Sequence, residues 1–377
     1  MPKRRPNWQT RFGFYLLAVG SAFGLGNLWR FPYVVGENGG GAFVLLYLFI
    51  GFLVGLPLLI GELTLGKLTR NSVLKATDRL GQNSENGKRF RAVGFLSLFL
   101  SLLVLSYYSV ISGWVLHFLS LFMAKLVFGR EGNWGLVLLM NNGWLQFLLA
   151  SSHLLIAMFV LFKGVQDGLE KWSGYVMPFF GFLVAILVVR TLSLTPSGDV
   201  LRFLFYPDFS KLTYFSLSHA LGHVFFTLSL GFGSLVTFGS YLQDHEHVPT
   251  VGFRVGLVDT TISLIGLLLI FPLAFKATDR PLTDPALLFD VVPQFFLELP
   301  GGTLYGFVFF LCLYLASLNA SLGLLENVVS NLTESVKAFS RTQATWVSGL
   351  LVLVFAVFPA LSTTSFQEVK LGSKSII

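Results

Sequence analysis

The sequence predicts an all-α polytopic membrane protein, and three observations support that prediction. Of the 377 residues, 54% are hydrophobic and only 12% are charged, and the mean hydropathy is +0.72. The apolar residues gather in runs of about 20 residues or more, the length of helix that crosses a bilayer. Two of these runs are interrupted by glycines, at 20–26 and at 231–233. Such a composition is typical of membrane proteins rather than of soluble domains.

Nine hydrophobic spans are expected along the chain. Several are longer than the roughly 20 residues needed to cross the hydrocarbon, so we expect tilted spans or spans that extend beyond the bilayer. Their approximate ranges are 12–36, 41–66, 92–124, 144–162, 172–192, 214–241, 250–275, 302–333 and 343–362.

The loops between the spans divide the basic residues unequally. With the N-terminus placed in the cytoplasm, 16 of the 26 Lys and Arg residues fall in cytoplasmic segments and 9 in outer segments, while Arg30 lies inside the first span. Positive residues concentrate in the cytoplasmic loops of membrane proteins. We therefore expect a cytoplasmic N-terminus and, with nine spans, an outer C-terminus. This topology explains the pI near 9.5 without a nucleic-acid partner.

The first and sixth spans share an unusual break. Residues 18–33 read AVGSAFGLGNLWRFPY, with an amide and a guanidinium beside the glycines, and the sixth span contains FFTLSLGFGS. Lipid offers no partner to freed backbone groups, so unwound backbone persists only against protein or a polar cavity. Paired broken spans at matching positions of two halves point to the binding site of a transporter. We expect one repeat of five spans over 1–192 and an incomplete repeat of four spans over 193–377.

The sequence shows no enzymatic constellation, and we expect a protein that is not an enzyme. Gly24-Leu25-Gly26 lacks the third glycine and the preceding strand of a dinucleotide loop. The six histidines share no zinc-like spacing. The lone Cys312 cannot form a disulfide within the chain, and we expect it to fill space in a helix.

Several motifs resemble the neurotransmitter:sodium symporter family, and above all its bacterial amino-acid members of the leucine-transporter type. The resemblance covers about 5–362 and implies an inverted five-helix-repeat fold with spans 1 and 6 broken at the midplane. The chain ends at Ile377 before a tenth span, so we expect a C-terminally truncated member. The motifs are GSAFGLGNLWRFPY at 20–33, GENGGGAF at 36–43, GLPLLIGELTLGK at 55–67, Tyr107-Tyr108, KGVQDGLEKW at 163–172 and FFTLSLGFG at 225–233.

The resemblance implies a site for an amino-acid zwitterion. The N–H groups of Leu25 and Gly26, with the Tyr108 hydroxyl, would hold the carboxylate. The ammonium would be held by the carbonyls of Ala22, Phe226 and Thr227 and by the Ser229 hydroxyl. The substrate side chain would contact Val104, Phe226, Phe232 and Leu324. Such a wall suits a neutral hydrophobic or aromatic amino acid, although each of these residues alone would read as ordinary core.

The resemblance also implies a first sodium site. Its ligands would be the Ala22 carbonyl, Asn27, Thr227, the substrate carboxylate and Asp259, which stands where many members carry asparagine. An ionised carboxylate inside the bilayer is costly unless paired, so we expect a bound cation beside Asp259, or its protonation. The alternative is an aspartate that caps the cytoplasmic end of span 7.

Chloride-dependent relatives hold an anion near that position. Tyr47, Thr227 and Ser263 resemble part of the chloride shell, but His223 stands where glutamine is usual. We predict that Asp259 supplies the fixed negative charge and that chloride is not required.

The second sodium site departs from the family pattern. By resemblance it would use the carbonyls of Gly20, Phe23 and Ala316 and two side-chain oxygens of span 8. Asn319 supplies one oxygen, but Ala320 stands where a serine is usual. One or two sodium ions therefore remain as alternatives, with a water as a further means of filling the gap.

Two gates follow from the resemblance. Arg5 with Glu334 would close the cytoplasmic side beside Trp8, and Arg30 with Phe226 would close the outer side. In addition, we expect Glu62 to satisfy unwound backbone.

The expected function is therefore sodium-coupled import of a neutral amino acid by alternating access. The alternatives are a truncated copy that does not transport, or an amino-acid sensor or channel with the same site. The expected location is a bacterial inner membrane. The expected partners are the amino acid and membrane lipid but not nucleic acid, and a homodimer is left open.

Overall fold

The structure is a computed structural model, which describes residues 24–82, 84–85, 87–130, 132, 134–194, 197–278, 287–336, 338–365, 370–371 and 374–375. Its α-helices are α2 (Phe31–Glu37), α3 (Gly41–Ile50), α4 (Leu56–Thr69), α5 (Val73–Gly81), α6 (Gly87–Phe128), α7 (Leu136–Met140), α8 (Gly143–Phe162), α9 (Lys171–Leu194), α10 (Ser197–Phe205), α11 (Tyr214–Thr227), α12 (Ser234–Gly239), α13 (Val248–Thr278), α14 (Leu287–Glu298), α15 (Gly302–Ser335) and α16 (Arg341–Leu361). Three π-helices, η1 (Gly26–Arg30), η2 (Gly51–Gly55) and η3 (Val165–Glu170), a 3₁₀ turn η4 (Phe209–Lys211) and two short antiparallel strands, β1 (Lys370–Leu371) and β2 (Lys374–Ser375), complete it.

Seven helices in the described part of the chain are long and apolar enough to cross a membrane. Each of them coincides with one of the predicted spans 2–5 and 7–9. The first span is described only from Gly24 onward, and the sixth is divided between α11 and α12. The order of these spans and the position of the break in the sixth span agree with the sequence prediction.

The sixth span breaks because its backbone leaves the right-handed helical region three times in five residues. Ser229, Gly231 and Gly233 have φ values of 54°, 82° and 78°. This left-handed conformation is easy for glycine but strained for serine. At Gly233 a Cβ atom would also lie only 2.7 Å from Cγ1 of Val73 in α5. We refer to residues 228–233 as the unwound segment.

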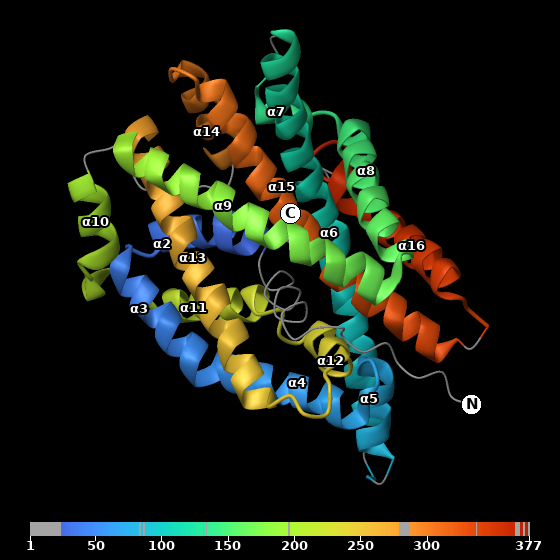
Figure 1. Ribbon diagram of the computed structural model, residues 1–377. Helices are drawn as coiled ribbons and strands as arrows, with labels where there is room; N and C mark the ends of the chain where they lie inside the picture. Colours follow the sequence, from blue (N-terminus) through green and yellow to red (C-terminus); the bar gives the residue numbers. More distant parts are fainter. Residues whose placement is uncertain are drawn as a thin grey trace.

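The long helix α15 runs through the centre of the molecule (Figure 1). Most of its residues are buried, including every residue from Ala316 to Asn331. It packs against α6, α8, α9 and α16, while α3, α4, α11 and α13 form a second group of contacting helices. Stacked and tilted rings of Phe118, Phe289 and Phe310 join α6, α14 and α15 at one end.

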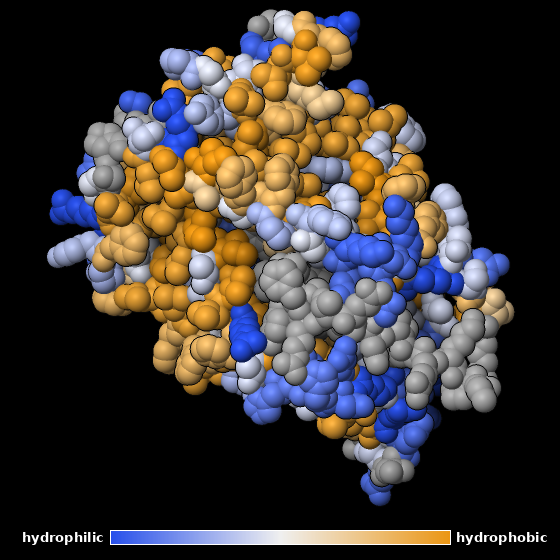
Figure 2. Space-filling model, in the orientation of Figure 1, coloured by the Kyte–Doolittle hydropathy of each residue, from blue (hydrophilic) through white to orange (hydrophobic). Residues whose placement is uncertain are grey.

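Hydrophobic residues cover most of one face, and hydrophilic residues gather near the end that holds α5 and α12 (Figure 2). Many large apolar side chains are exposed at the surface, with exposed fractions of 63% for Phe49, 68% for Phe52 and 64% for Phe159. Exposed apolar surface on this scale suits contact with lipid tails rather than with water.

Candidate functional site: a pocket between the two breaks

A pocket lies where η1, α6, the unwound segment and α15 meet. It brings together most of the residues predicted for the substrate site. The Leu25 N–H bonds to Tyr108, one of the lining residues. Ala22 lies outside the described residues. The residues that line it are Gly24, Gly26, Asn27, Val104, Tyr108, Phe226, Thr227, Ser229, Phe232, Ala320 and Leu324.

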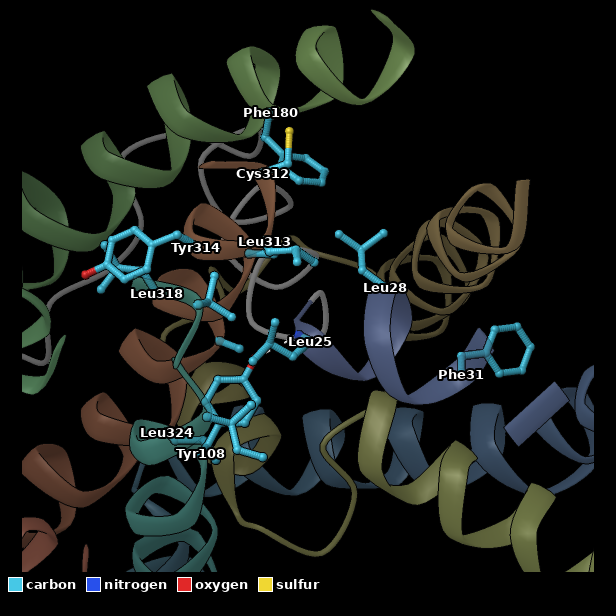
Figure 3. Packing of buried hydrophobic residues seen from close by; sticks show 14 of the residues in the cluster. Leu25, Leu28, Phe31, Tyr108, Phe180, Cys312, Leu313, Tyr314, Leu318 and Leu324 are labelled. Carbon is cyan, nitrogen blue, oxygen red and sulfur yellow. Dashed lines mark hydrogen bonds between the residues drawn. The ribbon is translucent and has the colours of Figure 1, made fainter. Parts of the chain in front are cut away.

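The hydroxyl of Tyr108 lies at the start of η1. The Leu25 N–H donates a hydrogen bond of 2.8 Å to Tyr108 Oη, and Figure 3 shows the Tyr108 ring pointing from α6 toward Leu25, beside Leu324. A Cβ atom on Gly24 would lie 2.6 Å from Tyr108 Oη and 2.9 Å from the Ala320 Cβ. Glycine at position 24 therefore permits this close approach of the broken helix to α6 and α15.

Two polar residues that line the pocket, Asn27 and Thr227, are bonded to a buried carboxylate beside it. Asn27 Nδ2 lies 2.8 Å from Asp259 Oδ1, 2.9 Å from Thr227 Oγ1 and 2.8 Å from Ser263 Oγ. Thr227 Oγ1 donates to Asp259 Oδ1 at 2.9 Å. Asn27 Oδ1 accepts a hydrogen bond from the Gly24 N–H at 3.2 Å. Four side chains from η1, α11 and α13 thus converge on one point.

Asp259 is fully buried, and its Oδ2 has no hydrogen-bond partner among the described residues. It lies well inside α13, which begins at Val248, so the alternative of a cap at the end of span 7 is wrong. An unpaired carboxylate oxygen at membrane depth is costly. Together with the hydroxyl oxygens of Thr227 and Ser263 it places three side-chain oxygens close together, and oxygen donors of this kind suit a hard cation.

The residues compared with a chloride shell also lie together. The His223 ring stacks on Phe31 at 4.7 Å and lies 5.4 Å from the Tyr47 ring. His223 is fully buried, and neither of its ring nitrogens has a hydrogen-bond partner in the described part of the chain. His223 lies one helical turn before Thr227 on α11.

The residues predicted for a second sodium site are placed only in part. Gly20 and Phe23 lie outside the described residues, and Ala316 is buried in α15. Asn319 turns toward α9: its Oδ1 accepts from Ser173 Oγ at 3.1 Å and its Nδ2 lies 3.5 Å from Met177 Sδ. Among the residues that the structure describes, no group of three or more His, Cys, Asp and Glu side chains could hold a metal ion.

The gate residues are likewise placed in part. The Arg30 guanidinium lies 5.0 Å from the centre of the Phe226 ring, so the two residues predicted for the outer gate are in contact. Glu334 accepts from the N–H and the hydroxyl of Ser72, at 3.0 and 2.6 Å. Its predicted partner Arg5, and Trp8, lie outside the described residues.

Glu62 of α4 contacts the unwound segment. Its Oε1 accepts the Gly231 N–H of the unwound segment at 2.7 Å. This confirms the prediction that a carboxylate of the second span satisfies freed backbone in the sixth.

Two residues of the pocket were not predicted as part of it. Gly24 and Ala320 line the cavity, whereas the sequence indicated Ala320 only as a missing sodium ligand. A polar network around Asn327 was also missed. Its signal in the sequence was the pair Asn327 and Asn331, one turn apart in an apolar span, since polar residues inside a membrane span usually serve a purpose.

Comparison with known proteins agrees with this architecture. The Sodium:neurotransmitter symporter family matches residues 5–134 and 138–369. An uncharacterized sodium-dependent transporter of Bacillus subtilis is 33% identical over 383 residues, which cover 100% of this chain and 83% of the relative. A second, from Haemophilus influenzae, is 29% identical over 99% of this chain and 84% of its own length.

A solved structure is similar along nearly the whole chain. It is the crystal structure of MhsT in complex with L-phenylalanine, with a TM-score of 0.89, 32% sequence identity, and coverage of 99% of this chain and 84% of that one. The fold is therefore the inverted five-helix-repeat fold of the leucine-transporter type, in a multi-pass membrane protein. The chain belongs to the sodium:neurotransmitter symporter family.

Proposed function

We propose that this protein is a sodium-coupled symporter that imports a neutral hydrophobic or aromatic amino acid by alternating access. The observation that supports it most is the pocket beside η1 and the unwound segment, which polar and apolar side chains line together. Membership of a sodium symporter family supports the coupling ion, and the binding of L-phenylalanine by MhsT supports the class of substrate.

The two ends of an amino acid would find complementary groups in this pocket. The N–H groups of Leu25 and Gly26 and the Tyr108 hydroxyl would hold the carboxylate, because N–H groups at a helix start attract anions. In the structure the Leu25 N–H donates to Tyr108 Oη, and the carboxylate would replace that bond. The carbonyls of Ala22, Phe226 and Thr227 and the Ser229 hydroxyl would accept from the ammonium. The wall of Val104, Phe226, Phe232 and Leu324 would contact the side chain, and an apolar wall of this kind favours neutral substrates.

Sodium, as the co-transported ion, would bind between Asp259, Thr227, Asn27 and the Ala22 carbonyl. In the structure the Asn27 amide nitrogen lies 2.8 Å from the Asp259 carboxylate. A half-turn of this amide would present its oxygen instead, which completes a ring of oxygen ligands of the type that hard cations prefer. The fixed charge of Asp259 would take the place of a chloride ion, so chloride would not be required.

The second sodium site would be weak. Ala320 offers no ligand, and Asn319 is engaged by Ser173. We therefore favour one tightly bound sodium ion per cycle. The chain would consist of the repeats 1–192 and 193–377, with its N-terminus in the cytoplasm of a bacterium and its helices in the inner membrane.

Uptake into proteoliposomes tests this function. We expect a sodium gradient to drive the accumulation of labelled L-phenylalanine or L-leucine, and a potassium gradient to drive none. Replacing chloride by gluconate should leave the rate unchanged. Asp259→Asn should raise the sodium concentration for half-maximal uptake by about tenfold or more, since it removes the charge that pairs with the cation.

The outcomes separate the alternatives. Binding of a labelled amino acid without uptake would favour a sensor or a copy that does not transport. Uptake that requires chloride would contradict the role of Asp259, and uptake without sodium would contradict the coupling.

A further inference from the structure

Asn327, in the second half of α15, is fully buried and uses every hydrogen bond that its amide can make. Nδ2 donates to the Phe232 carbonyl at 2.8 Å and to Ser101 Oγ at 3.0 Å. Oδ1 accepts from Thr237 Oγ1 at 2.6 Å and from Asn331 Nδ2 at 3.1 Å. A primary amide has two donors and two acceptor sites. This side chain is therefore saturated, with partners on α6, α12, α15 and the unwound segment.

One side of this network reaches the substrate pocket. Phe232 lines the pocket with its ring, and its carbonyl accepts from both Asn327 Nδ2 and Ser101 Oγ, each at 2.8 Å. The backbone that places the Phe232 ring is thus held by α15 and α6 together. Movement of that ring and movement of Asn327 are mechanically linked through a single carbonyl.

The other side of the network reaches α5. Asn331, one turn beyond Asn327, donates to the Asn327 carbonyl at 2.7 Å and accepts the Leu74 N–H at 3.0 Å. Glu334, close to one turn further along, accepts from Ser72. Helix α5 also packs on Gly233 through Val73. A continuous path of bonds therefore runs from Phe232 through Asn327 and Asn331 to the first turn of α5.

The hydrogen bonds of this path are expected to form or break together. A buried polar group that loses its partner costs about 1–3 kcal/mol, and a partly satisfied network is less stable than a complete one. If α12 moves away from α15, Thr237 Oγ1 loses its acceptor and Asn327 Oδ1 keeps only the bond from Asn331, so water must replace the lost bond at both atoms. The packed arrangement and a hydrated, open arrangement are then two distinct states.

We propose that Asn327 is a positioning residue that couples the substrate pocket to the α5–α12 end of the molecule, and that its bond to Thr237 holds that end closed. The inference rests on the proposed alternating access, in which this end faces the cytoplasm. It concerns the opening equilibrium itself, so it can be tested without any substrate.

A cysteine between α12 and α5 reports this opening. Val236 is 3% exposed and packs with Val73 and Ala76 of α5. We would introduce Val236→Cys after Cys312→Ala, which removes the lone native thiol, and measure its labelling by a polar maleimide in opened membranes. Thr237→Val, a nearly isosteric change, and Asn327→Ala should each raise the labelling rate by about tenfold, because each removes buried hydrogen bonds from the closed state only.

Two serines on α6 provide a matched comparison. Ser101→Ala removes the pocket-side bonds of the network, and we expect it to raise the rate in the same direction. Ser106 is equally buried, but its hydroxyl donates to the carbonyls of Leu102 and Val352, away from α12. Ser106→Ala should therefore leave the labelling rate at the parent value.

The result that overturns the proposal is equal labelling in Thr237→Val and in the parent, or an equal rise in Ser106→Ala, which would indicate general loosening. Size-exclusion profiles establish that each variant is folded, and Thr237→Val decides the matter if Asn327→Ala does not fold. Because no substrate is added, a failure of uptake in the proteoliposomes and a failure here are separate findings.

Discussion

At the scale of single residues, two buried tyrosine hydroxyls differ in their hydrogen-bond partners. The hydroxyls of Tyr108 and Tyr314 are both in buried tyrosines of long helices. Tyr108 accepts the Leu25 N–H at 2.8 Å, while the Tyr314 hydroxyl has no hydrogen-bond partner among the described residues. This difference makes the two tyrosines a natural pair for experiment.

Tyr108→Phe should weaken substrate binding by about tenfold or more, since a hydrogen bond to a charged group is worth roughly 1.5–3 kcal/mol. It also leaves the Leu25 N–H without its partner. Scintillation proximity binding of labelled L-phenylalanine measures the affinity. Tyr314→Phe, the control, should bind as the parent does, and an equal loss in both variants would remove Tyr108 from the site.

At the scale of elements, the breaks in the first and sixth spans decide where the pocket forms. The sixth span has left-handed backbone at three positions. Two of them, 231 and 233, are glycines, and the surroundings of these two glycines differ. A Cβ atom at Gly231 would meet nothing within 4 Å, whereas one at Gly233 would lie 2.7 Å from Val73. Conformation alone therefore favours glycine at 231, and conformation together with packing favours it at 233.

Gly231→Ala should lower thermal stability only modestly, because left-handed backbone costs an L-residue about 1–2 kcal/mol. Gly233→Ala should lower it further, because α5 must also shift. Apparent melting temperatures in detergent, followed by a thiol-independent fluorescence method, give the order. Equal melting temperatures for the two variants would show that the contact with Val73 is easily relieved.

At the scale of the whole molecule, the end that holds α5 and α12 is closed by a second buried contact besides the Asn327 network. Glu326 is fully buried and is held by Arg341 at 2.5 Å and by the Tyr241 hydroxyl at 2.9 Å. It joins α15, α16 and the chain after α12. Arg70 and Asp244 also form an ion pair at this end, but the Asp244 side chain is 98% exposed.

Arg341→Gln should destabilise the protein strongly, since removing one partner of a buried ion pair leaves an uncompensated charge and costs about 3–5 kcal/mol. Arg70→Gln should have a smaller effect, because its ionic partner Asp244 is exposed and water screens that pair. Apparent melting temperatures of both variants check this. Equal temperatures would mean that Glu326 finds another partner when Arg341 is lost.

Much of this architecture could be predicted from the sequence. Hydropathy located the spans because lipid forces each helix to be apolar along its length, and the glycines located both breaks. The Asn327 network could not be predicted, because its partners are distant in the sequence. Phe232 lies 95 positions before Asn327 and Ser101 lies 226 positions before it. Whether these residues meet depends on how the helices pack. For the same reason the sequence did not show that Asn319 turns to Ser173 or that Ala320 borders the pocket.

The buried carboxylate of Asp259 has an electrical consequence. A charge at this depth lies within the field of the membrane potential, which is worth about 2.3 kcal/mol per elementary charge for each 100 mV. In the proposed cycle an entering cation cancels the charge of an ionised Asp259, so the loaded site would reorient as a neutral unit. The empty site would return with its negative charge, and a potential that is negative inside would drive that return outward. The voltage of the cell would thus speed the resetting of the carrier rather than the inward step.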